Sequence, residues 1–324
     1  MKNLPLGTQS FEKMRDTKSN FLYVDKTERI FDLVSSGSVF FLSRPRRFGK
    51  SLLASTLRAL FEGRKEWFEG LYIYDKWDWS RKYPVINISF GSRSVGSAEI
   101  LRNTLSSLML GIAADNGIVL TEQYHTERFA QLIRELHREK KEKVVILIDE
   151  YDKAIRNNLN KSVEVQTAIR EVLRDFYEVI KDLDEHIHFV FITGVTKFAG
   201  VSIFSGLNNL VDITLNPRFC DICGYTQKEL QTYFDDYIDI LAKNHSWTRE
   251  KTLGVIKFWY NGYTWDGKTS IYNPYSTLNL FYKKSFSNYW FASATSGFLL
   301  DLVEKDYNYR ELVFDEINVS ENLL

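Results

Sequence analysis

The sequence predicts an α/β fold with a mainly parallel sheet flanked by helices, followed by a smaller, mostly helical part. From about residue 38 to residue 215, short apolar runs alternate with longer helix-like segments, which is the pattern of βαβ units. After Pro217, helical periodicity and an aromatic stretch rich in Gly and Asn replace the apolar runs. We therefore expect a sheet domain over residues 1–220 and a mostly helical domain, lid-like or winged-helix-like, over residues 221–324.

Five apolar runs are expected to form the strands of the sheet, at Val39–Ser43, Pro84–Phe90, Val144–Ile148, His188–Thr193 and Leu210–Leu215. The third run is apolar throughout, as expected for a strand that is covered on both faces. Apolar side chains at helical spacing predict helices at Ser51–Phe61, Ala98–Ala114, Glu122–Lys140, Val163–Leu183, Thr226–Ala242, Thr248–Tyr260, Tyr275–Lys283 and Ser296–Lys305.

The composition indicates a globular protein and excludes several classes. Hydrophobic residues make up 44 % of the 324 positions and the formal net charge is zero, whereas disordered chains combine low hydrophobicity with high net charge. The balanced charge also disfavours a direct nucleic-acid binder, which usually carries a basic excess. No run approaches the ~18 apolar residues of a membrane helix, and the first residues lack the apolar centre of a secretory signal. We therefore expect no membrane contact and a cytoplasmic location.

The segment FFLSRPRRFGKSLL, at positions 40–53, has the order strand, loop, helix that a phosphate-binding loop needs. The turn would direct backbone N–H groups and the positive helix end toward the phosphates. Lys50 would reach the β- and γ-phosphates, the Ser51 hydroxyl would hold Mg²⁺, and Gly49 would let the backbone approach closely. The fold class expected from this loop is that of a P-loop NTPase.

The loop departs from the general pattern G-x-x-x-x-G-K-[ST]. Arg44 stands where that pattern has Gly, and Pro45 removes one N–H donor. Arg46 and Arg47 either replace the lost anion-binding capacity or are solvated surface charges, and the residues alone leave both interpretations open. The expected nucleotide-binding residues are Arg44, Pro45, Arg46, Arg47, Phe48, Gly49, Lys50, Ser51 and Leu52.

The run VVILIDE provides the second half of the prediction, because its apolar residues end in Asp149 and Glu150 at the carboxyl edge of a strand. Asp149 would hold Mg²⁺ through water, and Glu150 would orient and polarise the attacking water. The interval between Lys50 and Asp149 contains the expected strand Pro84–Phe90. This fits the P-loop class in which an extra strand lies between the strand that precedes the P-loop and the strand that ends in the acid pair. The competing interpretation is that the acid pair only caps a helix.

Two further residues are candidates with weaker support. Thr193 ends the strand HFVFIT and either senses the γ-phosphate or merely terminates the strand. Arg218 either stabilises charge as an arginine finger or is an ordinary surface arginine. The predicted catalytic residues are therefore Lys50, Glu150 and Thr193, and the predicted metal ligands are Ser51 and Asp149.

Seven motifs resemble the bacterial AAA-ATPase-like family: FLYVDKT (Phe21–Thr27), FLSRPRRFGKSLLASTL (Phe41–Leu57), VVILIDEYDKAI (Val144–Ile155), FITGVTKF (Phe191–Phe198), CGYT (Cys223–Thr226), WYNGYTW (Trp259–Trp265) and YNPYS (Tyr272–Ser276). The resemblance spans nearly the whole chain and implies ATP and Mg²⁺ as ligands. Arg44 departs from the general pattern of a phosphate-binding loop, but it matches the form that this loop takes in the family. Longer members continue into a domain similar to PD-(D/E)xK nucleases, and we expect these 324 residues to end before any such domain.

Other features favour structural roles. The C-x-x-C pair Cys220 and Cys223 is interpreted as two structural thiols, since neither a second ligand pair nor a thioredoxin-like context accompanies it. The aromatic cluster over positions 259–275 is interpreted as core of the helical part, with base stacking as the alternative. Asp25 and Lys26 either hold adenine or are an N-cap and a solvent charge.

The leading hypothesis is an ATPase or ATP-driven switch that binds Mg-ATP between the sheet domain and the helical lid. The alternative is a nucleotide-sensing module with little turnover that controls an attached or partner effector such as a nuclease. A homo-oligomer or a partner subunit would be the source of an arginine supplied to the site from outside.

Overall fold

A five-stranded sheet forms the centre of the chain, for which the computed structural model describes residues 1–91, 95–196, 202–204 and 206–289. Its strand order is β2–β3–β4–β1–β5, and every neighbouring pair is parallel. The strands are β1 (Val39–Ser43), β2 (Val85–Ser89), β3 (Val144–Asp149), β4 (Ile187–Gly194) and β5 (Val211–Asp212). This is the α/β P-loop NTPase fold that the sequence predicts.

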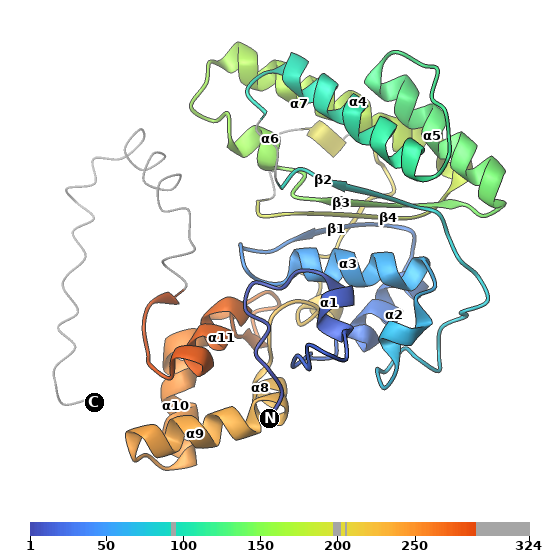
Figure 1. The fold of residues 1–324 in the computed structure, drawn as a ribbon. Helices are drawn as coiled ribbons and strands as arrows, with labels where there is room; N and C mark the ends of the chain where they lie inside the picture. Colours follow the sequence, from blue (N-terminus) through green and yellow to red (C-terminus); the bar gives the residue numbers. More distant parts are fainter. Residues whose placement is uncertain (92–94, 197–201, 205, 290–324) are drawn as a thin grey trace.

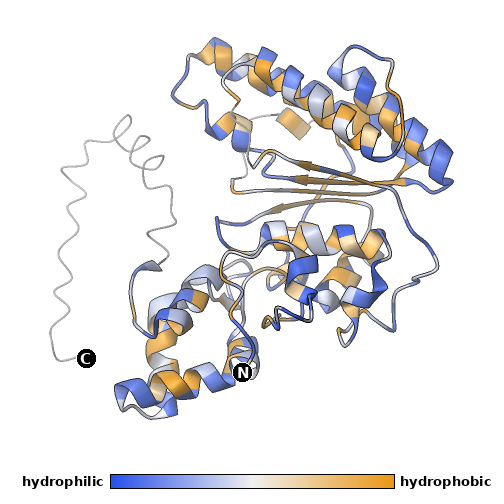
Figure 2. Cartoon of the chain, in the orientation of Figure 1, coloured by the Kyte–Doolittle hydropathy of each residue, from blue (hydrophilic) through white to orange (hydrophobic). Residues whose placement is uncertain are grey.

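Helices cover both faces of the sheet (Figure 1). Phe41 of β1 joins an apolar cluster with α4, α5 and α7, while Phe40 and Leu42 join a second cluster with α1, α2 and α3. This alternation follows from the pleat of a strand, and it leaves β1 and β3 buried at every position. Figure 2 accordingly shows the strands as an apolar layer between the helices. The helices of the sheet part are α1 (Phe11–Arg15), α2 (Thr27–Ser36), α3 (Lys50–Phe61), α4 (Ala98–Asp115), α5 (His125–Lys140), α6 (Lys153–Arg156) and α7 (Val163–Asp182).

The remainder of the described chain is mainly helical and has its own apolar cluster. Leu22 and Val24, which precede α2, are part of that cluster, and the Tyr237 hydroxyl donates a hydrogen bond to the Lys2 carbonyl. The N-terminal segment therefore packs on the helical part as well as on the sheet part. The elements are α8 (Gln227–Tyr233), α9 (Asp235–His245), α10 (Arg249–Tyr260), the hairpin strands β6 (Tyr263–Thr264) and β7 (Ser270–Ile271), and α11 (Pro274–Lys283).

Several elements differ from the prediction. In the sheet, β4 lies between β1 and β3. The strand expected at Pro84–Phe90 is β2, which comes between β1 and β3 in the sequence but lies at the edge of the sheet. The helix expected at Thr226–Ala242 is two helices that meet at the buried Phe234. The helix expected at Ser296–Lys305 lies outside the described residues. Among the described residues, no helix combines the length and apolar character needed to cross a bilayer.

Candidate functional site

The loop between β1 and α3 ends in a left-handed turn. Gly49 has a φ of 95° and immediately precedes Lys50, the first residue of α3. A Cβ at Gly49 would meet no atom within 4 Å, so there is space for a side chain. Glycine is favoured here because of the positive φ alone. The turn directs the first residues of α3, with their free N–H groups and positive dipole end, toward a cavity that Gly49, Lys50 and Ser51 line.

Lys50 is folded back onto its own loop. Its ammonium donates hydrogen bonds to the carbonyl oxygens of Arg44 (2.8 Å) and Pro45 (3.0 Å), and only 6 % of the residue is exposed. Burial lowers the pKa of Lys50, while the charge of Asp149 opposes that shift. A phosphate oxygen in the cavity would offer this buried cation a charged acceptor in place of two neutral ones.

The loop and the acidic strand meet through Ser51 and Asp149. The Ser51 hydroxyl donates a 2.6 Å hydrogen bond to Oδ2 of Asp149, whose Oδ1 accepts from the Glu150 amide at 3.0 Å. Asp149 is buried, and burial raises the pKa of its carboxyl group, against the hydrogen bond from Ser51 and the charge of Lys50. Two oxygens suited to a hard divalent cation therefore lie side by side beneath the cavity.

Glu150 lies next to this pair but turns another way. Its backbone is left-handed, with a φ of 56°, and its side chain lines the same cavity as Lys50. The nearest charged partner of its carboxylate is the ammonium of Lys153, which lies 3.7 Å from Oε2. The acid pair is thus divided, since Asp149 faces the P-loop while Glu150 faces Lys153.

Thr193 is placed beside Asp149 by the register of β3 and β4, and its other neighbour in the sheet is Leu42 of β1. The residue is fully buried and does not line the cavity. Its hydroxyl has no hydrogen-bond partner within the described part of the chain. The position fits an indirect contact to the site through Asp149, and a direct contact to a phosphate would require rearrangement.

The structure corrects the expectation for the Arg44 side chain. The guanidinium is buried and donates to the carbonyls of Ser43 (2.9 Å), Thr214 (2.7 Å) and Phe219 (3.2 Å), and it lies 4.3 Å from the centre of the Trp265 ring. Its amide donates to the Gly194 carbonyl, so neither group is available to a ligand. We expected Arg44 to contact the nucleotide. Its hydrogen bonds to Thr214 and Phe219 instead connect the P-loop to the segment that follows β5.

The other loop residues divide between the cavity and its surroundings. Arg46 and Arg47 line the cavity together with Leu52, and the Arg47 guanidinium lies 5.1 Å from the centre of the Tyr275 ring. Burial lowers the pKa of Arg46, and the nearby charge of Arg156 lowers it further. Pro45 and Phe48 do not line this cavity. Pro45 contributes its carbonyl to Lys50, and Phe48 packs against the β6–β7 hairpin.

The cavity has a volume of about 370 Å³ and three walls. The first wall is the P-loop with Glu150 and Lys153. The second is the N-terminal segment, through Pro5 and residues 7–9. The third is the start of α11 with Tyr225. The sheet part and the helical part therefore enclose one space, as a nucleotide site between them would require.

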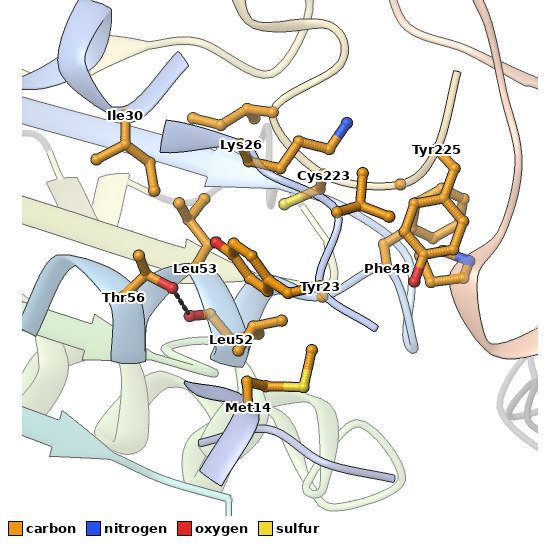
Figure 3. A pocket seen from close by; sticks show the side chains of 15 residues that line it. Met14, Tyr23, Lys26, Ile30, Phe48, Leu52, Leu53, Thr56, Cys223 and Tyr225 are labelled. Carbon is orange, nitrogen blue, oxygen red and sulfur yellow. Dashed lines mark hydrogen bonds between the residues drawn. The ribbon is translucent and has the colours of Figure 1, made fainter. Parts of the chain in front are cut away.

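A smaller apolar recess of about 70 Å³ adjoins the cavity and shares with it Met14, Gly49, Leu52, Tyr225 and Pro274. Figure 3 shows Tyr23 and Leu53 as further members of its lining. Lys26, which lines the recess, forms an ion pair of 2.6 Å with Glu229, and Glu229 also completes the capping box of α8.

Other expected candidates are placed away from the cavity. Asp25 lies two residues before the start of α2, and its carboxylate accepts from the amide of Thr27, the first residue of that helix, and from the amide of Tyr72, each at 2.8 Å. Arg218 forms a 3.0 Å ion pair with Asp32. Cys220 and Cys223 are buried free thiols, and burial raises the pKa of both, as suits structural cysteines. Lys26 and Cys223 line the apolar recess that adjoins the cavity.

This geometry agrees with a comparison to known protein families. The profile of a family described as predicted AAA-ATPase matches residues 5–204, more than half of the chain. The chain belongs to this AAA-ATPase-like family. It has the P-loop NTPase fold, and its family supports nucleotide binding at that general level.

Individual relatives of this AAA-ATPase-like chain add little about its role. An uncharacterized protein in the vnfD 5′ region of Azotobacter chroococcum mcd 1 is 43 % identical over 302 residues, which are 93 % of this chain and 56 % of that protein. The chain thus spans just over half the length of this curated relative. Drosophila ORC bound to poly(dA/dT) DNA and Cdc6 is 11 % identical, with 76 % of this chain and 38 % of that chain covered and a TM-score of 0.33. A similarity this low says nothing about ligands.

Several residues of the site were missed by the sequence analysis. The N-terminal wall at residues 5–9 and the α11 wall have no periodicity or charge pattern that indicates a ligand. The motif YNPYS marked the start of α11, and DEYDK contained Lys153, but nothing in either motif assigned a role. Only the fold brings these segments to the P-loop.

Proposed function

We propose that this chain binds Mg-ATP in the cavity and hydrolyses it. The observation that carries the proposal is the 2.6 Å hydrogen bond between Ser51 and Asp149, beside the buried ammonium of Lys50. It joins the P-loop to the end of the acidic strand beside the cavity, which Lys50 and Ser51 line and Asp149 does not. Binding of ATP in preference to other nucleotides rests on the family.

The donor set fits Mg²⁺ held jointly with a nucleotide. Mg²⁺ prefers oxygen ligands and usually takes one or two protein groups, with phosphates and waters completing its octahedron. Ser51 would bind it directly, and Asp149 would bind it directly or through water. Among the described residues no cluster of three His, Cys, Asp or Glu side chains could hold a metal alone, so the phosphates would complete the site. When bound, the ion would neutralise charge on the phosphates.

The remaining residues would position the nucleotide. Lys50 would exchange the carbonyls of its loop for β- and γ-phosphate oxygens, while the amides at the start of α3 cradle the chain. Arg46 and Arg47 would add positive charge at the mouth of the cavity. The adjoining recess, with the apolar faces of Tyr23 and Leu52, would take the base.

Hydrolysis would require Glu150 to face the γ-phosphate. There its carboxylate would accept a hydrogen bond from a water and orient it for in-line attack, while Lys50 stabilises charge on the transferred phosphoryl group. Thr193 would act from beside Asp149 as a buried positioning group. No covalent intermediate is required, because positioning and electrostatics supply most of the catalysis in this class of reaction.

Calorimetric titration with Mg-ATP tests the binding half of the proposal. Lys50→Ala should weaken affinity about tenfold to a hundredfold, because a charge-assisted hydrogen bond contributes about 1.5–3 kcal/mol. The exposed Lys161 provides a matched Lys→Ala control that should leave affinity unchanged. Equal affinity in the Lys50→Ala variant and the wild type would refute the assignment of the P-loop.

A phosphate-release assay tests the hydrolytic half. Glu150→Gln keeps the size and hydrogen-bonding reach of the side chain but removes the charge that polarises water. It should bind Mg-ATP as the wild type does and release almost no phosphate. Wild-type turnover in this variant would remove Glu150 from the mechanism.

The alternative, a nucleotide-sensing module that hydrolyses little, is favoured by one specific observation. The Glu150 carboxylate contacts the Lys153 ammonium, at 3.7 Å, rather than a residue of the P-loop. Such a module would use the bound nucleotide to control an attached or partner effector. A turnover well above roughly one per minute for the isolated chain would argue against it.

A further inference from the structure

We propose that Tyr275, at the start of α11, is a positioning residue whose ring competes with the nucleotide phosphates for the Arg47 guanidinium. The helical part of the chain then influences nucleotide affinity through one side chain of the P-loop. The inference rests on the proposed function, since the phosphates are those of the nucleotide in the cavity. Arg47 binds the phosphates in this account, and Tyr275 acts only through Arg47.

The P-loop contacts aromatic rings of the helical part through three of its side chains. Arg44 and Phe48 both pack on the Trp265 ring of the β6–β7 hairpin. These two P-loop residues are buried, and neither lines the cavity. Arg47 is exposed and lines the cavity, as does the ring that it contacts, Tyr275. A ligand in the cavity can therefore compete for the contact of Arg47 while it leaves the other two in place.

The Arg47 guanidinium has a ring as its neighbour but lacks an acceptor. It lies 5.1 Å from the centre of the Tyr275 ring, within the range of a cation–π contact. In the described part of the chain it forms no ion pair and no hydrogen bond. A guanidinium carries five N–H donors in a planar fork that matches phosphate oxygens. Phosphates in the cavity would supply the charged acceptors that this side chain lacks.

The backbone of Arg47 is a second observation that points to a ligand. Its φ of 68° is left-handed, a conformation that glycine adopts freely and that other residues rarely adopt. Arginine also lacks the short polar side chain with which Asn and Asp ease this conformation by a local hydrogen bond. Such outliers cluster at ligand sites. An arginine where the backbone favours glycine indicates that the guanidinium, rather than the turn itself, accounts for the residue.

Tyr275 is held at the edge of the cavity by its own helix. It is the second residue of α11, whose N-cap Asn273 accepts a 3.1 Å hydrogen bond from the Ser276 amide. Its ring also packs against the apolar cluster of the helical part. The exposed Arg47 side chain is therefore the partner that rotates when phosphates bind. A cation–π contact at an exposed site is weaker than charge-assisted hydrogen bonds to phosphate, so the phosphates win, at a cost in affinity.

The test is a double-mutant cycle on Kd, measured by calorimetry with Mg²⁺ and a non-hydrolysable ATP analogue. Tyr275→Leu and Tyr275→Met remove the ring but keep an apolar side chain for the cluster. Both should bind the analogue about two- to fivefold more tightly than the wild type, as expected for the loss of one exposed cation–π contact. Tyr275→Phe keeps a ring and should restore the wild-type Kd. Tyr282→Leu is the matched control, because Tyr282 is an exposed residue of the same helix that does not line the cavity.

The second arm of the cycle removes the guanidinium. Arg47→Ala should weaken binding about fivefold or more, because the charge-assisted hydrogen bonds to the phosphates are lost. In the Arg47→Ala background, Tyr275→Leu should have no further effect on Kd, since the ring acts through the guanidinium.

Three results overturn the inference. Unchanged binding in both ring-removing variants means that the ring does not compete, and weaker binding means that Tyr275 contacts the nucleotide itself. A gain that persists in the Arg47→Ala background means that Arg47 does not carry it. Wild-type affinity in Arg47→Ala means that the guanidinium does not bind the phosphates.

The proposed function is tested separately by the same titrations. It fails if the wild type does not bind the analogue, or if Lys50→Ala binds it equally well. If the wild type binds the analogue and Lys50→Ala weakens that binding, while the Tyr275 variants match the wild type, only the role of Tyr275 fails.

Discussion

At the scale of single residues, the site holds charges that folding does not favour. Burial shifts the pKa of Lys50 downward and that of Asp149 upward, so each charged form is disfavoured without a ligand. Both groups are partly compensated, Lys50 by loop carbonyls and Asp149 by the Ser51 hydroxyl. Groups placed for a ligand commonly reduce stability in this way.

Asp149→Asn should therefore stabilise the nucleotide-free chain while it removes Mg²⁺-dependent binding. A folded-state pKa above that of the unfolded chain means that folding favours the protonated form, so ionised Asp149 lowers the free energy of unfolding at neutral pH. Removing the charge should raise that free energy by ~0.5–2 kcal/mol at pH 7. The gain should shrink as the pH falls toward 3.8, the ordinary value for Asp.

Denaturant titrations of the two proteins at several pH values measure this effect. A variant that is less stable at pH 7, or whose gain does not depend on pH, would contradict the account of Asp149. Its affinity for ATP should also become insensitive to Mg²⁺.

Thr193→Val provides a second prediction at this scale. The Thr193 hydroxyl is buried without a partner in the described chain, and valine replaces it at nearly equal volume. The substitution should change the free energy of unfolding by less than about 1 kcal/mol and leave ATP affinity unchanged, but lower turnover if the hydroxyl positions the site. Thermal unfolding and phosphate release check both halves. Wild-type turnover in this variant would mean that Thr193 only ends the strand and has no part in hydrolysis.

At the scale of elements, the β6–β7 hairpin packs against the back of the P-loop. The Phe48 ring centre lies 4.7 Å from that of Tyr263 and 5.7 Å from that of Trp265, and the Arg44 guanidinium lies over the Trp265 ring. The hairpin belongs to the helical part of the chain, so this contact links the conformation of the loop to the position of that part.

Trp265→Ala should weaken Mg-ATP binding as well as stability, because it removes a ring on which both Phe48 and the Arg44 guanidinium pack. We expect a loss of about 1–3 kcal/mol in the free energy of unfolding, in the range for a partly buried aromatic. Trp247→Ala is the matched control, since Trp247 packs on His245 and Phe286, away from the loop. The control should lose stability alone. If both variants bind Mg-ATP like the wild type, the hairpin does not shape the loop.

At the scale of the whole molecule, three separate segments enclose the cavity, and a nucleotide should stabilise them together. Hydrogen exchange measured with a non-hydrolysable ATP analogue and Mg²⁺ should slow in the P-loop, the N-terminal segment and the start of α11. At a ligand concentration 100 times Kd, the gain in the free energy of unfolding should be about 2.7 kcal/mol. Protection confined to the P-loop would mean that the other two walls do not contact the nucleotide.

Much of this arrangement could be predicted from local sequence signals. The run Val144–Ile148 could be interpreted as a strand because burial on both faces demands apolar residues at every position. The meeting of Ser51 with Asp149 followed from parallel strands, whose carboxyl ends share one edge of the sheet. The position of Lys50, Glu150 and Arg46 at one cavity follows from the same shared edge, while their roles stay predictions.

What could not be predicted depends on long-range packing. The short helix α1 and the hairpin β6–β7 have weak local signals and are held by contacts with distant residues such as Ser55 and Phe48. The role of Arg44 was missed because a basic residue in a phosphate loop suggests a ligand, and only the fold shows the three carbonyls that it meets.

The most direct test of the account is a crystal structure with Mg²⁺ and a non-hydrolysable ATP analogue. We predict that the Lys50 ammonium leaves the Arg44 and Pro45 carbonyls for the β- and γ-phosphates, and that a Mg²⁺ ion lies between Ser51 and Asp149. An analogue bound elsewhere, with Lys50 still on its loop carbonyls, would contradict the central claim.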